Sequence, residues 1–89
     1  MDSKRKAKFS QAVVYVKLKE GVLDPQGLTI KKALEKLGYE NIKEVRSGKF
    51  FEIVFDSNGT QQSTKFLNEI SDKLLANPVI EKFEIEMLK

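Results

Sequence analysis

The 89-residue sequence contains no cysteine and no histidine. Without cysteine it can form neither a disulfide nor a thiolate nucleophile, and without either residue it lacks the usual ligands of protein zinc sites. The missing imidazole also removes the side chain that most often transfers protons at neutral pH. Most catalytic constellations cannot be assembled from this chain alone, so we expect neither a catalytic residue nor a metal site in it.

Long apolar runs are absent as well. No stretch approaches the ~18–20 residues of a membrane span, and the N-terminus has no apolar segment of the signal-peptide kind. We therefore expect a cytoplasmic protein without a membrane partner. Its length corresponds to one domain, which at this size buries only roughly 60–65% of its unfolded surface, so association would stabilise it.

The formal net charge of +3 is concentrated at the N-terminus. Residues 1–8 carry four cations and one anion, and the rest of the chain carries 12 of each. We interpret residues 1–10 as a flexible basic arm and residues 11–89 as a single domain with balanced charge. Nucleic-acid-binding domains usually have a basic face in the folded body, so we expect no nucleic-acid partner.

Hydrophobic periodicity predicts a strand, a helix, an extended segment, a second helix and a final strand. Residues 12–18 are predicted to form a strand with Ala12, Val14, Val16 and Leu18 on one face and Val13, Tyr15 and Lys17 on the other. Residues 79–88 are predicted to form the last strand, in which Phe83, Ile85 and Met87 alternate with charged side chains. Residues 25–37 and 61–76 carry apolar side chains at helical spacing, and 56–59 (DSNG) has the composition of a turn. The expected fold is α+β and ferredoxin-related, β-α-β(-β)-α-β, with two helices on one face of an antiparallel sheet.

Four residues have structural roles that their types predict. Asp24 is a natural N-cap, and Pro25 fits the first helical position, where its missing N–H costs nothing. Gly38 suits the left-handed residue after the helix. Gly48, inside an otherwise strand-like segment, indicates a bend or a close approach of backbones.

The segment 41–55 allows several interpretations. In RSGK, Arg46 and Lys49 flank Ser47 and Gly48, which could form an anion-binding nest, but the spacing of a P-loop is missing. KFFEIVF has a passing likeness to the base-stacking strand of RNA-recognition motifs. That pattern requires a glycine and a small residue where this chain has Phe50 and Glu52. A core strand that buries residues 51, 53 and 55 is the simpler interpretation.

The blocks GVLDPQG (21–27) and VRSGK (45–49) closely resemble the PurS family, the small subunit of multi-subunit phosphoribosylformylglycinamidine synthase. The resemblance extends over about residues 12 to 88. It implies a non-catalytic adaptor of purine biosynthesis that joins a PurQ-type glutaminase to a PurL-type, ATP-dependent synthetase and assists ammonia transfer. It also implies a homodimer or dimer of dimers, and a subunit without its own cofactor in a complex that uses ATP, glutamine and magnesium.

The family fold exchanges segments between two subunits. A single strand over 41–55 would span ~50 Å, far beyond the ~17–20 Å of a typical strand. We therefore predict a long central strand that bends at Ser47 and Gly48 and crosses a two-fold, segment-swapped dimer interface. A hairpin at Gly48 is the alternative.

Residues around this crossing are the candidate contacts with partner subunits: Arg46, Lys49, Gln26 and Gly27. The last two could instead shape the helix start, and Arg46 could instead pair with Glu44 or Glu52 in the same chain. The alternative function is a free-standing dimeric regulatory module that binds a small ligand at the dimer interface.

Overall fold

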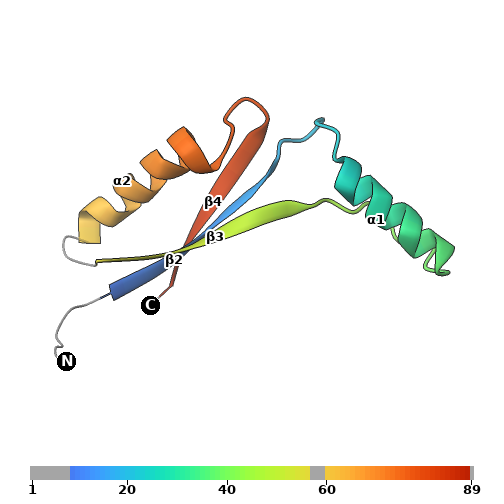
Figure 1. Cartoon of the computed structure of the whole chain (residues 1–89), viewed down its shortest axis with the longest axis horizontal. Coiled ribbons are helices and arrows are strands. Elements are labelled where there is room, and N and C mark those ends of the chain that lie inside the picture. Colours follow the sequence, from blue (N-terminus) through green and yellow to red (C-terminus); the bar gives the residue numbers. More distant parts are fainter. Residues whose placement is uncertain (1–8, 57–59, 89) are drawn as a thin grey trace.

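The computed structural model describes residues 9–56 and 60–88 (Figure 1). Along the chain it contains the elements β2 (Phe9–Leu18), α1 (Pro25–Lys36), β3 (Gly48–Asp56), α2 (Thr60–Ile70), the π-helical turn η1 (Ser71–Leu75) and β4 (Glu81–Leu88). The predicted α+β class is confirmed. Most of the expected arm and most of the expected 56–59 turn lie outside the described residues, and β2 begins two residues inside the segment interpreted as the arm.

The three strands form one antiparallel sheet in the order β3-β2-β4. Val14 and Val16 of the central strand are fully buried on the face that α2 covers. They form the core with Ala76, and partly buried side chains pack around them: Phe51, Ile53, Leu75, Phe83 and Ile85. In β4 the predicted alternation of less and more exposed positions holds from Glu81 to Glu86, but Met87 is 46% exposed. In β2 the predicted core face is buried at Ala12, Val14 and Val16, and Val13 on the other face is buried too.

Helix α1 begins and ends as the sequence predicts. Asp24 is its N-cap and Pro25 its first residue. At the other end, the amide of Gly38 donates to the carbonyl of Glu35 and that of Tyr39 to Leu34, both at 3.0 Å. With Gly38 at φ 100°, this is a Schellman motif, which satisfies the last carbonyl groups of a helix.

The second helix changes its hydrogen bonding near its end. Residues 60–70 are α-helical, and the next turn is π-helical, with the amide of Ala76 donating to the carbonyl of Ser71 at 2.9 Å. Ala76 is already extended, so the helix ends just before Asn77 and Pro78, where a proline disfavours helical backbone.

The prediction of one strand over 41–55 is wrong for its first half. Residues 41–47 have no regular secondary structure, and β3 begins at Gly48. The hairpin alternative is contradicted too, because β3 pairs with β2 without interruption from Gly48 to Asp56. The chain before Gly48 runs back beside α1 (Figure 1) and pairs with none of the strands in the described part of the chain.

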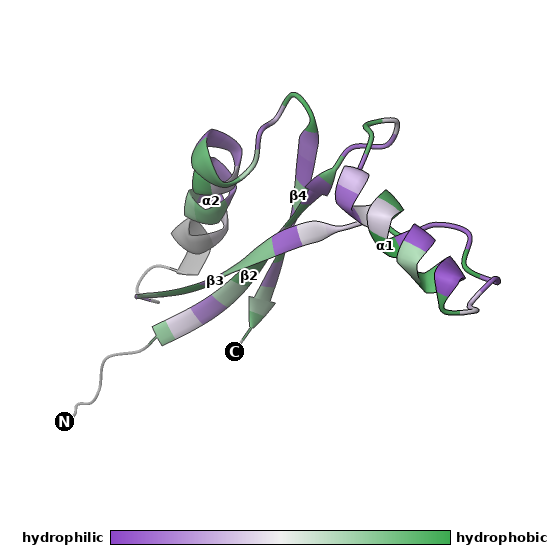
Figure 2. Ribbon diagram, turned by 45° about the vertical axis from the view of Figure 1, so that its right-hand side comes forward, coloured by the Kyte–Doolittle hydropathy of each residue, from purple (hydrophilic) through white to green (hydrophobic). Residues whose placement is uncertain are grey.

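Helix α1 lies beyond the end of the sheet, whereas α2 lies over its face (Figures 1 and 2). Its apolar side chains are consequently accessible: Leu28 is 44%, Ile30 39% and Leu37 72% exposed. Amphipathic spacing correctly identified the helix, but the sheet of this chain does not bury its apolar side.

Candidate functional site

The two sequence blocks GVLDPQG and VRSGK meet at the carboxylate of Asp24. Its Oδ1 accepts hydrogen bonds from the amide of Gly27 and the hydroxyl of Ser47, both at 2.9 Å. Its Oδ2 accepts from the amide of Ser47 at 2.5 Å. Asp24 is only 5% exposed, so one buried carboxylate both caps α1 and fastens the segment that leads into β3.

These hydrogen bonds also set the ionisation of Asp24. The amide of Gly27, followed by the amide of Ser47, lowers its pKa below the ordinary value for aspartate. Burial acts in the opposite direction, and the Ser47 hydroxyl and the charge of Arg46 add smaller lowering effects. The group is therefore anionic at neutral pH, as an N-cap that accepts three donors should be.

Gly27 and Gln26 occupy different environments within the first turn of α1. Gly27 is buried, and a Cβ there would collide with the carbonyl oxygen of Val45 and lie 2.9 Å from Oδ2 of Asp24. The side chain of Gln26 is exposed beside it. The glycine therefore permits the close approach of residues 41–47 to the helix, while the glutamine is accessible to a partner.

Arg46 and Lys49, the two predicted partner contacts, point to different parts of the chain. Arg46 donates from Nη1 to the carbonyl of Val22 at 3.1 Å and from Nη2 to that of Lys19 at 3.4 Å. Its hydrogen bonds thus go to the loop before α1, and Glu44 and Glu52 are not its partners among the described residues. Lys49 lies 3.9 Å from the Glu81 carboxylate, on the sheet face that α2 covers.

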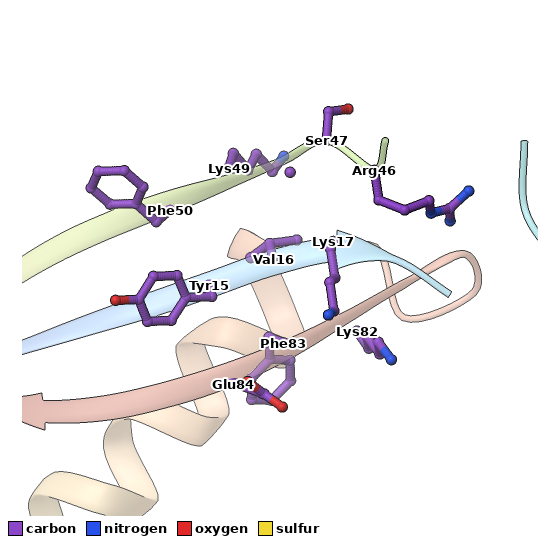
Figure 3. Close-up of a pocket in the computed structure, with 11 residues that line it drawn as sticks. Tyr15, Val16, Lys17, Arg46, Ser47, Lys49, Phe50, Lys82, Phe83 and Glu84 are labelled. Atoms are coloured by element: carbon purple, nitrogen blue, oxygen red, sulfur yellow. The ribbon is translucent and has the colours of Figure 1, made fainter. Parts of the chain in front are cut away.

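The RSGK segment does not form the anion-binding nest considered from the sequence. Asp24 already accepts the amide hydrogen of Ser47, and the cations on either side have different partners: Arg46 donates to the carbonyl groups of Val22 and Lys19, and Lys49 lies near the carboxylate of Glu81. Figure 3 shows both side chains beside Ser47. Gly48 has another role: a Cβ there would lie 2.7 Å from the carbonyl oxygen of Val16. It therefore marks a close approach of backbones at the start of a strand.

A hollow of about 420 Å³ adjoins this segment, on and around the first residues of β3 (Figure 3). Tyr15 and Phe50 are in contact along one side, with ring centroids 6.2 Å apart. Sequence reasoning missed this pair. Strand alternation already separates position 50 from the core positions 51 and 53, but only the β2–β3 register brings Phe50 beside Tyr15.

Within residues 9–56 and 60–88, no three His, Cys, Asp or Glu side chains gather in a way that could hold a metal ion. None of the helices described there is long and apolar enough to cross a membrane.

Comparison with known proteins identifies the relatives of this chain. Residues 11–89 match the family model "PurS: Phosphoribosylformylglycinamidine (FGAM) synthase". The PurS subunit of Methanocaldococcus jannaschii is 43% identical over 79 residues, which is 89% of this chain and 95% of the relative. That of Bacillus subtilis is 40% identical over 74 residues, covering 83% and 87%.

Solved structures agree with these matches. The crystal structure of M. jannaschii PurS superposes with a TM-score of 0.80, covering 92% of this chain and 98% of the other. A chain of the PurLQS structure from Thermotoga maritima gives 0.82 at 25% identity, covering 91% and 99%. The chain therefore belongs to the PurS family of FGAM synthase subunits.

Proposed function

We propose that this chain, a subunit of FGAM synthase, is a non-catalytic adaptor that joins a PurQ-type glutaminase to a PurL-type synthetase. The observation that carries the proposal is the family match over 11–89 together with the likeness to a chain of the T. maritima PurLQS structure. The absence of histidine and cysteine from the sequence agrees with a role in association. ATP, glutamine and magnesium are then used by the partner subunits, in the cytoplasm, and ammonia transfer between them is the step that the adaptor assists.

We further propose that the adaptor is a homodimer, or a dimer of dimers, in which a second copy covers α1. Leu28, Ile30 and Leu37 are exposed on this helix, as are Leu23 and Tyr39 at its ends, at 70% and 57%. A helix in water normally buries its apolar stripe, and exposed apolar patches of this kind are typical of interaction sites. The sheet of the same chain does not cover α1. A second copy that exchanges this segment would bury the apolar side chains of the helix.

Reconstitution tests the adaptor role. The purified chain is mixed with PurL-type and PurQ-type subunits, and formation of the amidine product is measured with glutamine and, separately, with ammonium chloride as the nitrogen source. We expect glutamine-dependent activity only when all three chains are present, and ammonia-dependent activity with the synthetase alone. Full glutamine-dependent activity without this chain would contradict the proposal.

Sedimentation equilibrium of the isolated chain tests the dimer independently. A mass of twice or four times 10.2 kDa is expected. Replacement of Ile30 and Leu37, which are seven residues apart and share one side of α1, by glutamate would shift the chain toward the monomer, since it places charges on the exposed apolar side of the helix. A monomer in the wild type would refute the dimer while leaving the adaptor role open.

A further inference from the structure

The sheet face opposite α2 carries a second feature that the adaptor role does not use. Alternation along the strands places Tyr15 and Lys17 of β2 there, with Gly48 and Phe50 of β3 and Lys82 of β4 beside them. Phe50 is 60% and Tyr15 43% exposed. Two aromatic rings and two ammonium groups therefore share one open surface at the hollow of Figure 3.

Lys17 and Lys82 are directly opposite each other on neighbouring strands. Like charges in such a cross-strand pair are destabilising, and neither ammonium group has a carboxylate partner among the described residues. Figure 3 shows the side chain of Lys17 directed toward β4, where Lys82 lies. An anion placed between the two would remove the repulsion, so the arrangement favours a ligand with negative charge.

Position 48 lies at the basic end of the hollow. Gly48 is the partner of Lys17 in the β2–β3 register, and both residues line the hollow. Two residues along a strand separate Tyr15 from Lys17 by about 6.6 Å. A planar group stacked on the aromatic pair can therefore place an attached anion at the lysines.

We propose that this hollow, the nucleotide hollow, binds a nucleoside monophosphate. Its base would stack on the exposed ring of Phe50 beside Tyr15, since aromatic side chains stack on bases of any sequence. Its phosphate would accept hydrogen bonds from Lys17 and Lys82, whose ammonium groups bind phosphate as point charges. The volume of about 420 Å³ suits a ligand of this size.

The charges around the hollow favour a single nucleotide over a nucleic acid strand. Glu52, Glu84 and Glu86 lie on the same sheet face as the aromatic pair. Glu84 lines the hollow itself, and Glu86 accepts a hydrogen bond from the Tyr15 hydroxyl at 2.9 Å. A polynucleotide bound across the sheet would bring its phosphates close to these carboxylates. A nucleoside monophosphate has a single phosphate, which can lie at Lys17 and Lys82.

The test is a titration of the ¹⁵N-labelled full chain with adenosine 5′-monophosphate, adenosine, inorganic phosphate and a short oligoadenylate, followed by amide chemical shifts. We expect the monophosphate to shift residues 15–17, 48–50 and 82–84 with a Kd of about 0.1–1 mM, because the hollow is open and the ligand small. Adenosine and phosphate alone should bind more weakly at the same residues.

Variants separate the two halves of the nucleotide hollow. The double variant K17M/K82M keeps the aliphatic stems and should weaken the monophosphate about tenfold or more, since it removes charge-assisted hydrogen bonds, while adenosine is unaffected. F50L should weaken the monophosphate and adenosine but not phosphate. The matched control K36M changes an exposed lysine of α1 and should leave all affinities unchanged.

Thermal unfolding provides a second readout. K17M/K82M should raise the melting temperature of the ligand-free chain, because the repulsion is gone, and should abolish the increase that the monophosphate causes in the wild type. Shifts absent up to about 10 mM ligand, unchanged affinity in K17M/K82M, or oligoadenylate affinity that grows with length would each overturn the proposal. Reconstituted amidine formation is not involved, so either proposal can fail without the other.

Discussion

Replacing Gly27 by alanine tests whether the contact between α1 and residues 41–47 holds this part of the molecule together. Gly27 lies in the first turn of α1, where alanine would ordinarily stabilise the helix by up to about 1 kcal/mol. Here the new Cβ meets the carbonyl oxygen of Val45 and approaches Oδ2 of Asp24 to 2.9 Å. Because the carbonyl of Val45 belongs to the backbone, the clash can be relieved only if residues 41–47 move away from the helix.

Overpacking of this kind typically lowers the stability of the fold by about 1–3 kcal/mol. Because the carbonyl of Val45 is a backbone group and cannot move alone, we expect a loss near the upper end, about 2–3 kcal/mol. Subtracting the gain in helix propensity leaves a net loss of about 1–2 kcal/mol, which corresponds to a factor of roughly 5–30 in an opening equilibrium. The displaced carboxylate would also lose its hydrogen bonds to Ser47, so helix and segment should loosen together.

Native-state hydrogen exchange measures this loss where it occurs. We expect amides in the first two turns of α1 to exchange about 5–30-fold faster in G27A, with the β2 amides much less affected. Gln26 is the matched control, since its side chain is exposed in the same turn, and Q26A should change exchange little. Protection in G27A equal to or above that of the wild type would refute the close contact.

Three further predictions concern ionisation, the core and assembly. The pKa of Asp24 is lowered in the folded chain. The ionised carboxylate therefore stabilises the fold above the unfolded pKa of about 3.9, and this stabilisation is lost as the pH falls through the folded pKa. Hydrogen-exchange protection of the α1 amides should decline on acidification in the wild type and decline less in D24N. Leu67 is fully buried and Leu74 82% exposed, so by urea denaturation L67A should lose about 2–5 kcal/mol and L74A about 0.5 kcal/mol or less. R46E should weaken assembly with PurL-type and PurQ-type subunits in calorimetry, because it removes an exposed cation and frees the carbonyl groups of Lys19 and Val22; unchanged affinity would leave the candidate contact without a role.

Features encoded within a few residues were predictable. The N-cap at Asp24 and the left-handed Gly38 depend on hydrogen bonds that span three to five residues, so the sequence alone indicates where α1 starts and stops. The alternation predicted for β2 and β4 likewise identified the core positions Val14, Val16, Phe83 and Ile85. The blocks GVLDPQG and VRSGK indicated the family that the comparisons confirm.

Features that depend on distant segments were not predictable. Ser47 bonds to Asp24 across 23 positions of the sequence, and nothing local to either residue specifies that contact. Residues 41–47 contain two strand-favouring residues and β3 contains five, but a strand also requires a neighbour with free hydrogen-bonding groups; residues 41–47 lie beside α1 instead. The Tyr15–Phe50 pair likewise follows from strand register, which periodicity alone does not determine.

The hydrogen bonds of Gly27 and Ser47 to the Asp24 carboxylate explain how α1 can present a binding surface in an adaptor. An isolated helix of 12 residues is marginal in water, and this one lies beyond the sheet that would otherwise stabilise it. The buried carboxylate, the close approach at Gly27 and the Schellman motif at Gly38 hold the helix ordered while its leucines remain accessible. A surface that is ordered before association loses less conformational entropy on binding. The contacts that hold α1 in place therefore favour its association with a partner subunit.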